Sequence, residues 1–409
     1  MRSHEEQFLV LLGDRPVGRL YRKNDLTRFA FDPSYWDDPD RHVLGLRFED
    51  DPRAQHRSSM RLPPWFSNLL PEGRLREWIA FARRASIARE MELLAQVGQD
   101  LPGAVRVVAA DEMLPVDLSD QGQLDALAPR SAGSPWTFSL AGVGLKFSML
   151  QEGDRLTIPA SGEDGDWIVK LPDPIYRDVP RNEFAMMTLA RAVGIDVPEV
   201  RLVPRDEIEW LPDRAWSSGE ALAYAVKRFD RGPDRRRFHI EDLAQVRGFY
   251  PEKKYDGTFE TVGSLIYRRK NVVCVQEFAR RLAFSILIGN GDAHLKNWSL
   301  IYRDGRNATL APAYDLVATF VYRRDIDGPE EIALKFGGVK RLDRVSIEAF
   351  IRLEQRLGVK VELGDLVREV VEGVLSKWPI AEENLAESPG LAGRIKGYID
   401  ERAAQLLRR

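Results

Sequence analysis

Short apolar stretches separated by turn residues fill the first part of the chain. Such runs, split by Gly and Asn-Asp turn signals, are typical of antiparallel strands in a meander. Helical spacing of apolar residues follows, with Ser86 as the expected N-cap of the second helix. The strands are predicted over 8–12, 17–21, 28–31 and 104–109, and the helices over 73–84 and 87–97. We therefore expect a small α/β unit over residues 1–110.

The remainder of the chain changes from a strand pattern to a helix pattern. Residues 111–134 are acidic and dotted with Ser, Pro and Gly, which is typical of a linker or a surface excursion. Residues 135–230 then predict a sheet-rich unit and residues 231–409 a helical one. The predicted strands cover 138–150, 167–171, 197–203 and 221–229; the predicted helices cover 183–193, 275–287, 347–357, 366–375 and 391–407. A sheet-rich unit followed by a larger helical unit is typical of a two-lobed α+β enzyme.

Composition narrows the class of protein. The chain has 409 residues, 44% of them hydrophobic and 30% charged, as expected for a soluble folded protein, and a net charge of −3 argues against a dedicated nucleic-acid binder. Cys274 is the single cysteine, which fits a reducing compartment, and with five scattered histidines it argues against a zinc site. The acidic start and the lack of an apolar run of roughly 20 residues argue against a signal peptide or membrane span, so we expect a cytoplasmic protein.

The strongest chemical signal is a loop that follows the helix predicted over 275–287. Its Asp292-x-x-x-x-Asn297 spacing matches a protein-kinase catalytic loop, in which the aspartate accepts the substrate proton and the asparagine binds Mg²⁺. Asp315 lies where a second metal ligand is expected, although Leu316-Val317 stands in place of Phe-Gly. The alternative is an ordinary polar turn with Asp315 as a cap. The joint spacing in a helix-loop-strand context favours catalysis.

Two segments upstream suit the binding of phosphates. Lys170 ends an apolar strand, as the ATP-contacting lysine of protein kinases does, and Glu183 on the next helix is placed to pair with it. The alternative is a lysine that extends from a strand edge into solvent. Lys227 competes for the role but lies in a segment better suited to an interlobe hinge. Residues 139–146 hold two glycines and Lys146 before a strand, which suits either a phosphate loop or a plain turn. Together these motifs predict a two-lobed protein-kinase-like fold.

The motifs occur in the order found in one family. The chain resembles the HipA-type toxin kinases, which are Ser/Thr kinases of bacterial type II toxin–antitoxin systems, over roughly residues 5 to 400. The motifs that carry the resemblance are Phe66-Ser67-Asn68-Leu69-Leu70-Pro71-Glu72-Gly73, Ser139-x-Ala-Gly-x-x-x-Lys146, Ile168-Val169-Lys170-Leu171-Pro172, Asn182-Glu183, Arg228-Phe229-Asp230-Arg231, Asp292-x-His294-x-Lys296-Asn297 and Tyr314-Asp315.

The resemblance implies a role for each matched residue. Asp292 would be the general base, and Asn297 and Asp315 would hold Mg²⁺. Lys170 would contact the ATP phosphates with Glu183 beside it. Ser139 would be an autophosphorylated gate serine that switches the kinase off. The remaining nucleotide-facing residues would be Ala141, Gly142, Val143, Gly144, Leu145 and Lys146 in the phosphate loop, Lys227, Arg228 and Phe229 at the adenine, and His294, Leu295, Lys296, Asn297 and Tyr314.

One departure concerns the phosphate loop, where the apolar Val143 and Leu145 replace a polar pair found in many members, and Ser148 is a rival phosphoacceptor. The resemblance implies a toxin that uses ATP and Mg²⁺ to phosphorylate a protein, in the family an aminoacyl-tRNA synthetase. It also implies a helix-turn-helix antitoxin of the HipB type and contact with DNA through that complex. A corepressor module with weak or no kinase activity is one alternative. A small-molecule kinase is another, against which the separate unit at 1–110 argues.

Overall fold

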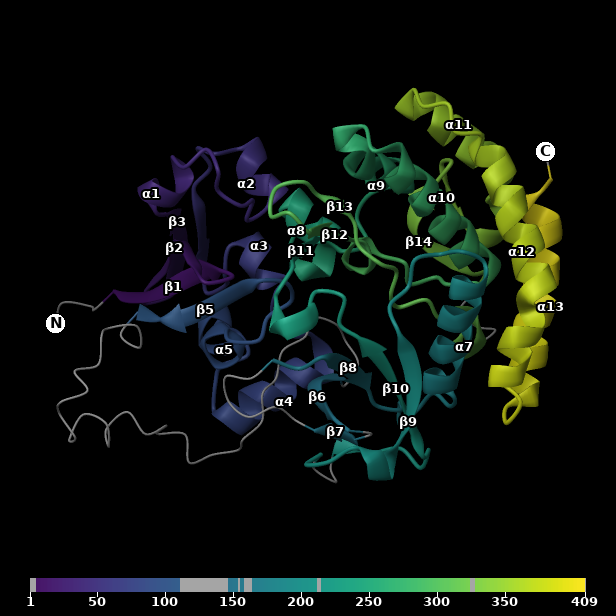
Figure 1. The fold of residues 1–409 in the computed structure, drawn as a ribbon, viewed down its shortest axis with the longest axis horizontal. Coiled ribbons are helices and arrows are strands. Elements are labelled where there is room, and N and C mark those ends of the chain that lie inside the picture. Colours follow the sequence, from purple (N-terminus) through teal and green to yellow (C-terminus); the bar gives the residue numbers. More distant parts are fainter. Residues whose placement is uncertain are drawn as a thin grey trace.

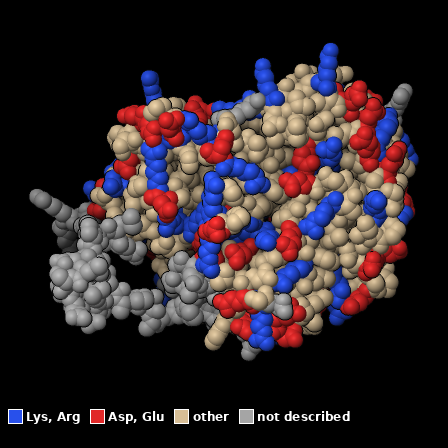
Figure 2. All heavy atoms as spheres, in the orientation of Figure 1, with Lys and Arg blue, Asp and Glu red and all other residues tan. Residues whose placement is uncertain are grey.

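The computed structural model describes residues 5–110, 146–153, 155–157, 164–211, 215–323 and 328–408. Figure 1 shows an N-terminal α/β domain, a middle sheet and a helical lobe with long helices along its outer side. Basic and acidic side chains lie intermingled over the face drawn in Figure 2. No described helix is long and apolar enough to cross a lipid bilayer.

The N-terminal domain is an antiparallel sheet with strand order β4-β3-β2-β1-β5. A left-handed Gly13 closes the turn between its first two strands. The strands are β1 (Glu6–Leu12), β2 (Arg15–Lys23), β3 (Leu26–Phe31), β4 (His56–Ser59) and β5 (Val105–Ala109), and the helices are α1 (Pro33–Trp36), α2 (Leu46–Asp50), α3 (Pro64–Ser67), α4 (Gly73–Arg83) and α5 (Glu90–Val97). The predicted start of α5 was wrong. Arg89 is its N-cap and makes no side-chain capping hydrogen bond, while the backbone N–H of Ser86, three residues earlier, donates to Glu92.

The middle sheet is antiparallel, with strand order β7-β6-β8-β10-β9. It comprises β6 (Lys146–Glu152), β7 (Arg155–Thr157), β8 (Trp167–Lys170), β9 (Val200–Pro204) and β10 (Leu222–Lys227), and α7 (Val179–Ala192) packs against β9 and β10. The register pairs Lys170 with Lys146 on one side and with Tyr224 on the other. Because paired residues share a face, these three side chains form one row. The apolar face of β6 and β8 joins the core of the N-terminal domain, so the two units share one buried cluster.

The helical lobe is built around α10 (Val272–Leu287), whose buried face follows the predicted three-and-four spacing. Helices α9 (Phe259–Ile266), α12 (Leu363–Asn384) and α13 (Pro389–Leu406) pack against it. The lobe also contains α8 (Leu243–Arg247), α11 (Ile347–Leu357) and the small strands β11 (His239–Asp242), β12 (Ser299–Tyr302), β13 (Thr309–Leu310), β14 (Glu331–Phe336) and β15 (Val339–Arg341). Helix α12 is longer than the predicted 366–375, because its buried face continues through Trp378 and Ala381 past the internal Pro379.

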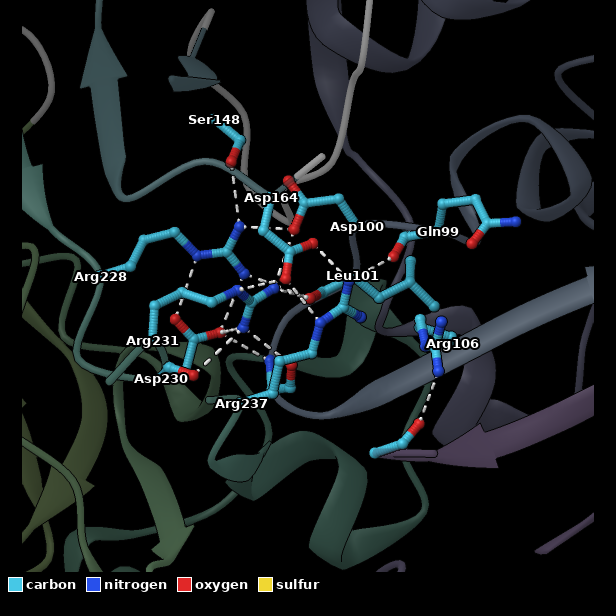
Figure 3. Close-up of polar contacts among 12 residues, drawn as sticks. Gln99, Asp100, Leu101, Arg106, Ser148, Asp164, Arg228, Asp230, Arg231 and Arg237 are labelled. Carbon is cyan, nitrogen blue, oxygen red and sulfur yellow. Dashed lines mark hydrogen bonds and ion pairs between the residues drawn. The ribbon is translucent and has the colours of Figure 1, made fainter. Parts of the chain in front are cut away.

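A buried cluster of charges joins the N-terminal domain to the segment that links the two lobes (Figure 3). We call it the hinge cluster; its members are Arg228, Arg231, Arg237, Asp100, Asp164 and Asp230. Arg228 donates to Asp100 at 2.7 Å and to the carbonyl of Leu101 at 3.2 Å. Arg231 donates to Asp100 at 2.8 Å. The segment after β10 is therefore held from the N-terminal side, which fixes the backbone that enters the cleft between the lobes.

Candidate active site

The sheet lobe contributes a lysine with two carboxylate partners. The Lys170 Nζ donates to Glu183 Oε1 on α7 at 2.6 Å and also pairs with Asp315 from the helical lobe. Its ammonium lies 5.5 Å from the centre of the Tyr224 ring. Burial alone would lower the pKa of Lys170, but Asp315 and Glu183 outweigh burial and raise it. The structure thus brings together three residues that are far apart in the sequence and keeps a positive charge between the lobes.

The helical lobe presents the loop that carries Asp292. Gly289 turns the chain at the end of α10 with a left-handed φ of 67°, and a Cβ there would lie 2.6 Å from the Phe320 ring. The buried Asn290 then organises the loop: its side-chain oxygen accepts from the backbone N–H of Asp292 at 3.1 Å, and its amide donates to the carbonyl of Asp315 at 3.2 Å. Asn290 therefore links the two aspartates, a role that the sequence analysis missed.

Tyr255 holds the carboxylate of Asp292. Its hydroxyl donates to Asp292 Oδ1 at 2.6 Å, and its ring packs edge-on against His294 with 5.1 Å between centres. Burial and the neighbouring Asp292 carboxylate raise the pKa of Tyr255, so the hydroxyl remains a donor at neutral pH. The Asn297 amide donates to the carbonyl of Asp292 at 2.9 Å and closes the loop. Tyr255 belongs to no motif in the sequence, so nothing there marked it.

Two residues that the family resemblance places at the nucleotide, Leu295 and Arg228, have buried side chains. Leu295 is fully buried in the helical core and does not line the cleft, so its side chain serves packing and its nucleotide contact stays a prediction. The Arg228 guanidinium points into the hinge cluster, so only its backbone is available to the cleft. The Lys227 side chain is exposed and lies 3.3 Å from Glu199. Phe229 does line the cleft, and its ring stacks on Tyr314 with 5.8 Å between centres.

Asp315 and Asn297 have the oxygen ligands that Mg²⁺ prefers. Burial would raise the pKa of Asp315, but the ammonium groups of Lys170 and Lys146 hold it at about 2. Neither Asp315 Oδ2 nor Asn297 Oδ1 accepts a hydrogen bond from a described residue. Carboxylate and amide oxygens of this kind fit a hard cation. The residues present therefore fit a magnesium ion.

A cleft of about 740 Å³ is lined by residues of both the sheet lobe and the helical lobe. This volume suits a nucleotide-sized ligand. Apolar side chains of Ile168, Val226 and Ile240 line the cleft together with charged residues of both lobes. Burial lowers the pKa of Lys146 to about 8, with Asp315 opposing the shift. Other predicted residues on its wall are Lys170, Glu183, Asp292, His294, Lys296, Asn297, Tyr314 and Asp315.

The two candidate phosphoacceptors differ in what the structure describes. Ser139 and the loop at 141–145 lie outside the described residues. Ser148 is fully buried on β6 and accepts a hydrogen bond from Arg228 at 3.0 Å. Its hydroxyl is thus part of the joint between the domains and does not face the cleft.

Comparison with known proteins assigns the chain to a family. The HipA-like C-terminal domain matches residues 138–378, and the HipA N-terminal domain matches residues 8–108. The chain belongs to the HipA family. A putative kinase of Sinorhizobium fredii, Y4dM, is 42% identical over 406 residues, which are 96% of this chain and 95% of that protein. The recognition of a HipA-type toxin kinase is thereby confirmed, and with it the prediction of an enzyme of the protein-kinase class.

Two further relatives come from Shewanella oneidensis. The serine/threonine-protein kinase toxin HipA is 28% identical over 298 residues, which cover 65% of each chain. A solved complex of HipA, HipB and operator DNA contains a chain that superposes with a TM-score of 0.72 at 22% identity, covering 98% of this chain and 96% of that one. The predicted two-lobed, kinase-like α+β fold is therefore confirmed.

Proposed function

We propose that this HipA-family chain transfers the γ-phosphoryl group of ATP to a serine or threonine hydroxyl of a protein in the presence of Mg²⁺. The observation that carries the proposal is the bridge from Lys170 to Glu183 and Asp315, on the wall of a cleft that also holds Asp292. A lysine fixed by a helix glutamate and a metal-binding aspartate is the arrangement that phosphoryl transfer requires.

Some residues of the site would stabilise negative charge on the phosphates, and Asp292 would accept the proton of the acceptor hydroxyl. Lys170 and Lys146 place positive charge where the nucleotide phosphates would lie, which favours the charge that builds up during transfer. Bound Mg²⁺, held by Asn297 and Asp315, would neutralise further charge on the phosphates. Tyr255 occupies Asp292 Oδ1, and Oδ2 accepts no hydrogen bond from a described residue. Oδ2 is therefore available to orient the acceptor hydroxyl and take its proton.

For the biological role, we propose a toxin that phosphorylates an aminoacyl-tRNA synthetase and is restrained by a HipB-type antitoxin. The fold shared with the Shewanella HipA–HipB–operator DNA complex supports such a partner. Lys340 and Arg341 of the basic run at 335–341 pair with Glu331 and Asp343, so association with DNA would run through the antitoxin, as the shared fold with that complex supports. We keep Ser139 as the proposed autophosphorylation site, since the buried Ser148 already serves the hinge cluster.

The test uses the full chain with γ-labelled ATP, Mg²⁺ and a panel of purified aminoacyl-tRNA synthetases. Mass spectrometry should find phosphoserine or phosphothreonine on one of them, and Asp315→Ala should abolish the transfer while the protein stays folded. Asp14→Ala, at an exposed turn of the N-terminal domain, is the matched control and should transfer normally. Equal labelling by Asp315→Ala and the wild type would refute the proposal. Labelling of small molecules alone would favour a small-molecule kinase.

A further inference from the structure

The lysine of the catalytic loop reaches from the wall of the cleft to the N-terminal domain. Lys296 lies next to Asn297 and is almost completely buried. Its Nζ donates to the backbone carbonyl of Asn68 at 2.9 Å and to Asn68 Oδ1 at 3.2 Å. It also forms an ion pair with Glu72 Oε1 at 2.9 Å. The N-terminal domain therefore holds the catalytic loop directly through a side chain.

We propose that Glu72 and Asn68 are positioning residues for phosphoryl transfer, and that the N-terminal domain thereby forms part of the catalytic machinery. This proposal rests on the function proposed above. Both residues line the cleft. Each contacts Lys296, on a loop whose other members are Asp292 and Asn297, so each is placed to act through that lysine. The N-terminal domain would then set the geometry of the loop as well as offer a surface to partners.

The Glu72 carboxylate pairs with lysines and does not cap its own helix. Glu72 is the N-cap residue of α4, yet its side chain caps no backbone N–H of that helix. The carboxylate instead pairs with Lys296 and, at 3.1 Å, with Lys254. Burial would raise the pKa of Glu72, but these two ammonium groups outweigh it and hold the pKa at about 2. Glu72 therefore carries a negative charge at neutral pH.

The opposite side of the loop is held by the helical lobe. The Tyr314 hydroxyl donates to the backbone carbonyl of Lys296 at 2.8 Å, and Tyr314 immediately precedes Asp315. Lys296 is therefore fixed by its side chain to one domain and by its backbone to the irregular segment after β13 that carries a candidate metal ligand. If Glu72 lost its charge, the carboxylate that remains beside the buried Lys296 ammonium would be that of Asp242, at the longer distance of 3.7 Å. A buried charge without its partner is costly, so the loop should shift.

The experiment compares Glu72→Gln with Glu252→Gln in the full chain. Glu252 is a matched control because it also bridges the domains, pairing with Arg61 at 2.5 Å and 3.0 Å, but contacts no residue of the loop. One readout is amide hydrogen–deuterium exchange of residues 289–298 without nucleotide. The second is the split between kcat and the KM for ATP. The exchange readout does not depend on kinase activity, so failure of the proposed function and failure of this inference are distinguishable.

We expect Glu72→Gln to speed exchange in 289–298 and to lower kcat roughly 10- to 100-fold, the usual effect of removing a residue that orients an active-site group, with KM for ATP nearly unchanged. Glu252→Gln should change neither. Equal effects of the two variants would mean that the contact only docks the domains and would overturn the proposal, as would unchanged exchange in Glu72→Gln. If Glu72→Gln does not fold, Glu72→Asp should show the same changes to a smaller degree, and wild-type behaviour of that variant would overturn it.

Discussion

Removal of one charge from the hinge cluster should destabilise the protein far more than the same substitution at the surface. The cluster holds three arginines and three aspartates, so Asp100→Asn keeps the shape and leaves a net positive charge. Asp100 Oδ1 accepts from both Arg228 and Arg231, and these three side chains are 1–3% exposed. Solvent therefore cannot replace the missing charge. Breaking a buried ion pair in this way costs about 3–5 kcal/mol in the free energy of unfolding.

Asp14 provides the matched control, because its carboxylate also pairs with an arginine, Arg106, at 2.7 Å. The Asp14 side chain is 103% exposed, and exposed pairs contribute about 0–1 kcal/mol. Both variants replace one paired aspartate with asparagine. The contrast between them isolates the effect of burial.

The assay is urea unfolding at neutral pH, followed by tryptophan fluorescence. With an m-value of about 3 kcal/mol/M, the expected loss moves the midpoint of Asp100→Asn down by roughly 1–1.7 M, whereas that of Asp14→Asn should move by less than about 0.3 M. The transition should be the one shared by the N-terminal domain and the middle sheet, since these have a common core. Midpoints that fall equally in the two variants would refute the argument that the cluster acts as a buried joint.

The other predictions concern acid stability and two cleft residues. Asp100 has a lowered pKa in the fold, because the nearby arginines outweigh burial. Its contribution to stability should therefore be complete above about pH 4 and be lost as the pH falls through that lowered pKa. Asp100→Asn should lessen the slope of unfolding free energy against pH in this acid range, and an unchanged slope would contradict this. Lys170→Met should lower transfer from γ-labelled ATP roughly 10²- to 10³-fold, while the surface variant Lys396→Met keeps wild-type rates; similar rates in both would refute the role of Lys170. Tyr255→Phe should lower kcat roughly 10-fold with KM for ATP unchanged, and an unchanged kcat would show that Asp292 needs no such donor.

Local periodicity predicted most of the fold. The helix expected at 347–357 is α11 residue for residue, because its apolar stripe and following Gly358 define both ends. Strand β4 was missed, since His56-Arg57-Ser58-Ser59 shows no apolar alternation at the edge of its sheet. Helix α7 begins at Val179, before the predicted 183, because Pro180 suits its first turn.

The candidate site was predictable where spacing carries the chemistry. Lys170, Asp292 and Asp315 stand in recognisable motifs, and the structure places all three on one cleft. Contacts between distant segments were not predictable, because no local pattern specifies them. Tyr255 lies 37 residues from Asp292, and Asn68 lies 228 residues from Lys296. No local pattern in the sequence indicates that Tyr255 contacts Asp292 or that Asn68 contacts Lys296.

The most direct test of the central claim compares the wild type with Asp292→Asn for both ATP binding and transfer of the labelled phosphoryl group to protein. If Asp292 takes the proton of the acceptor hydroxyl, the variant should bind ATP within about two-fold of the wild type and transfer at least roughly 10²-fold more slowly. Transfer by Asp292→Asn at the wild-type rate would contradict the account.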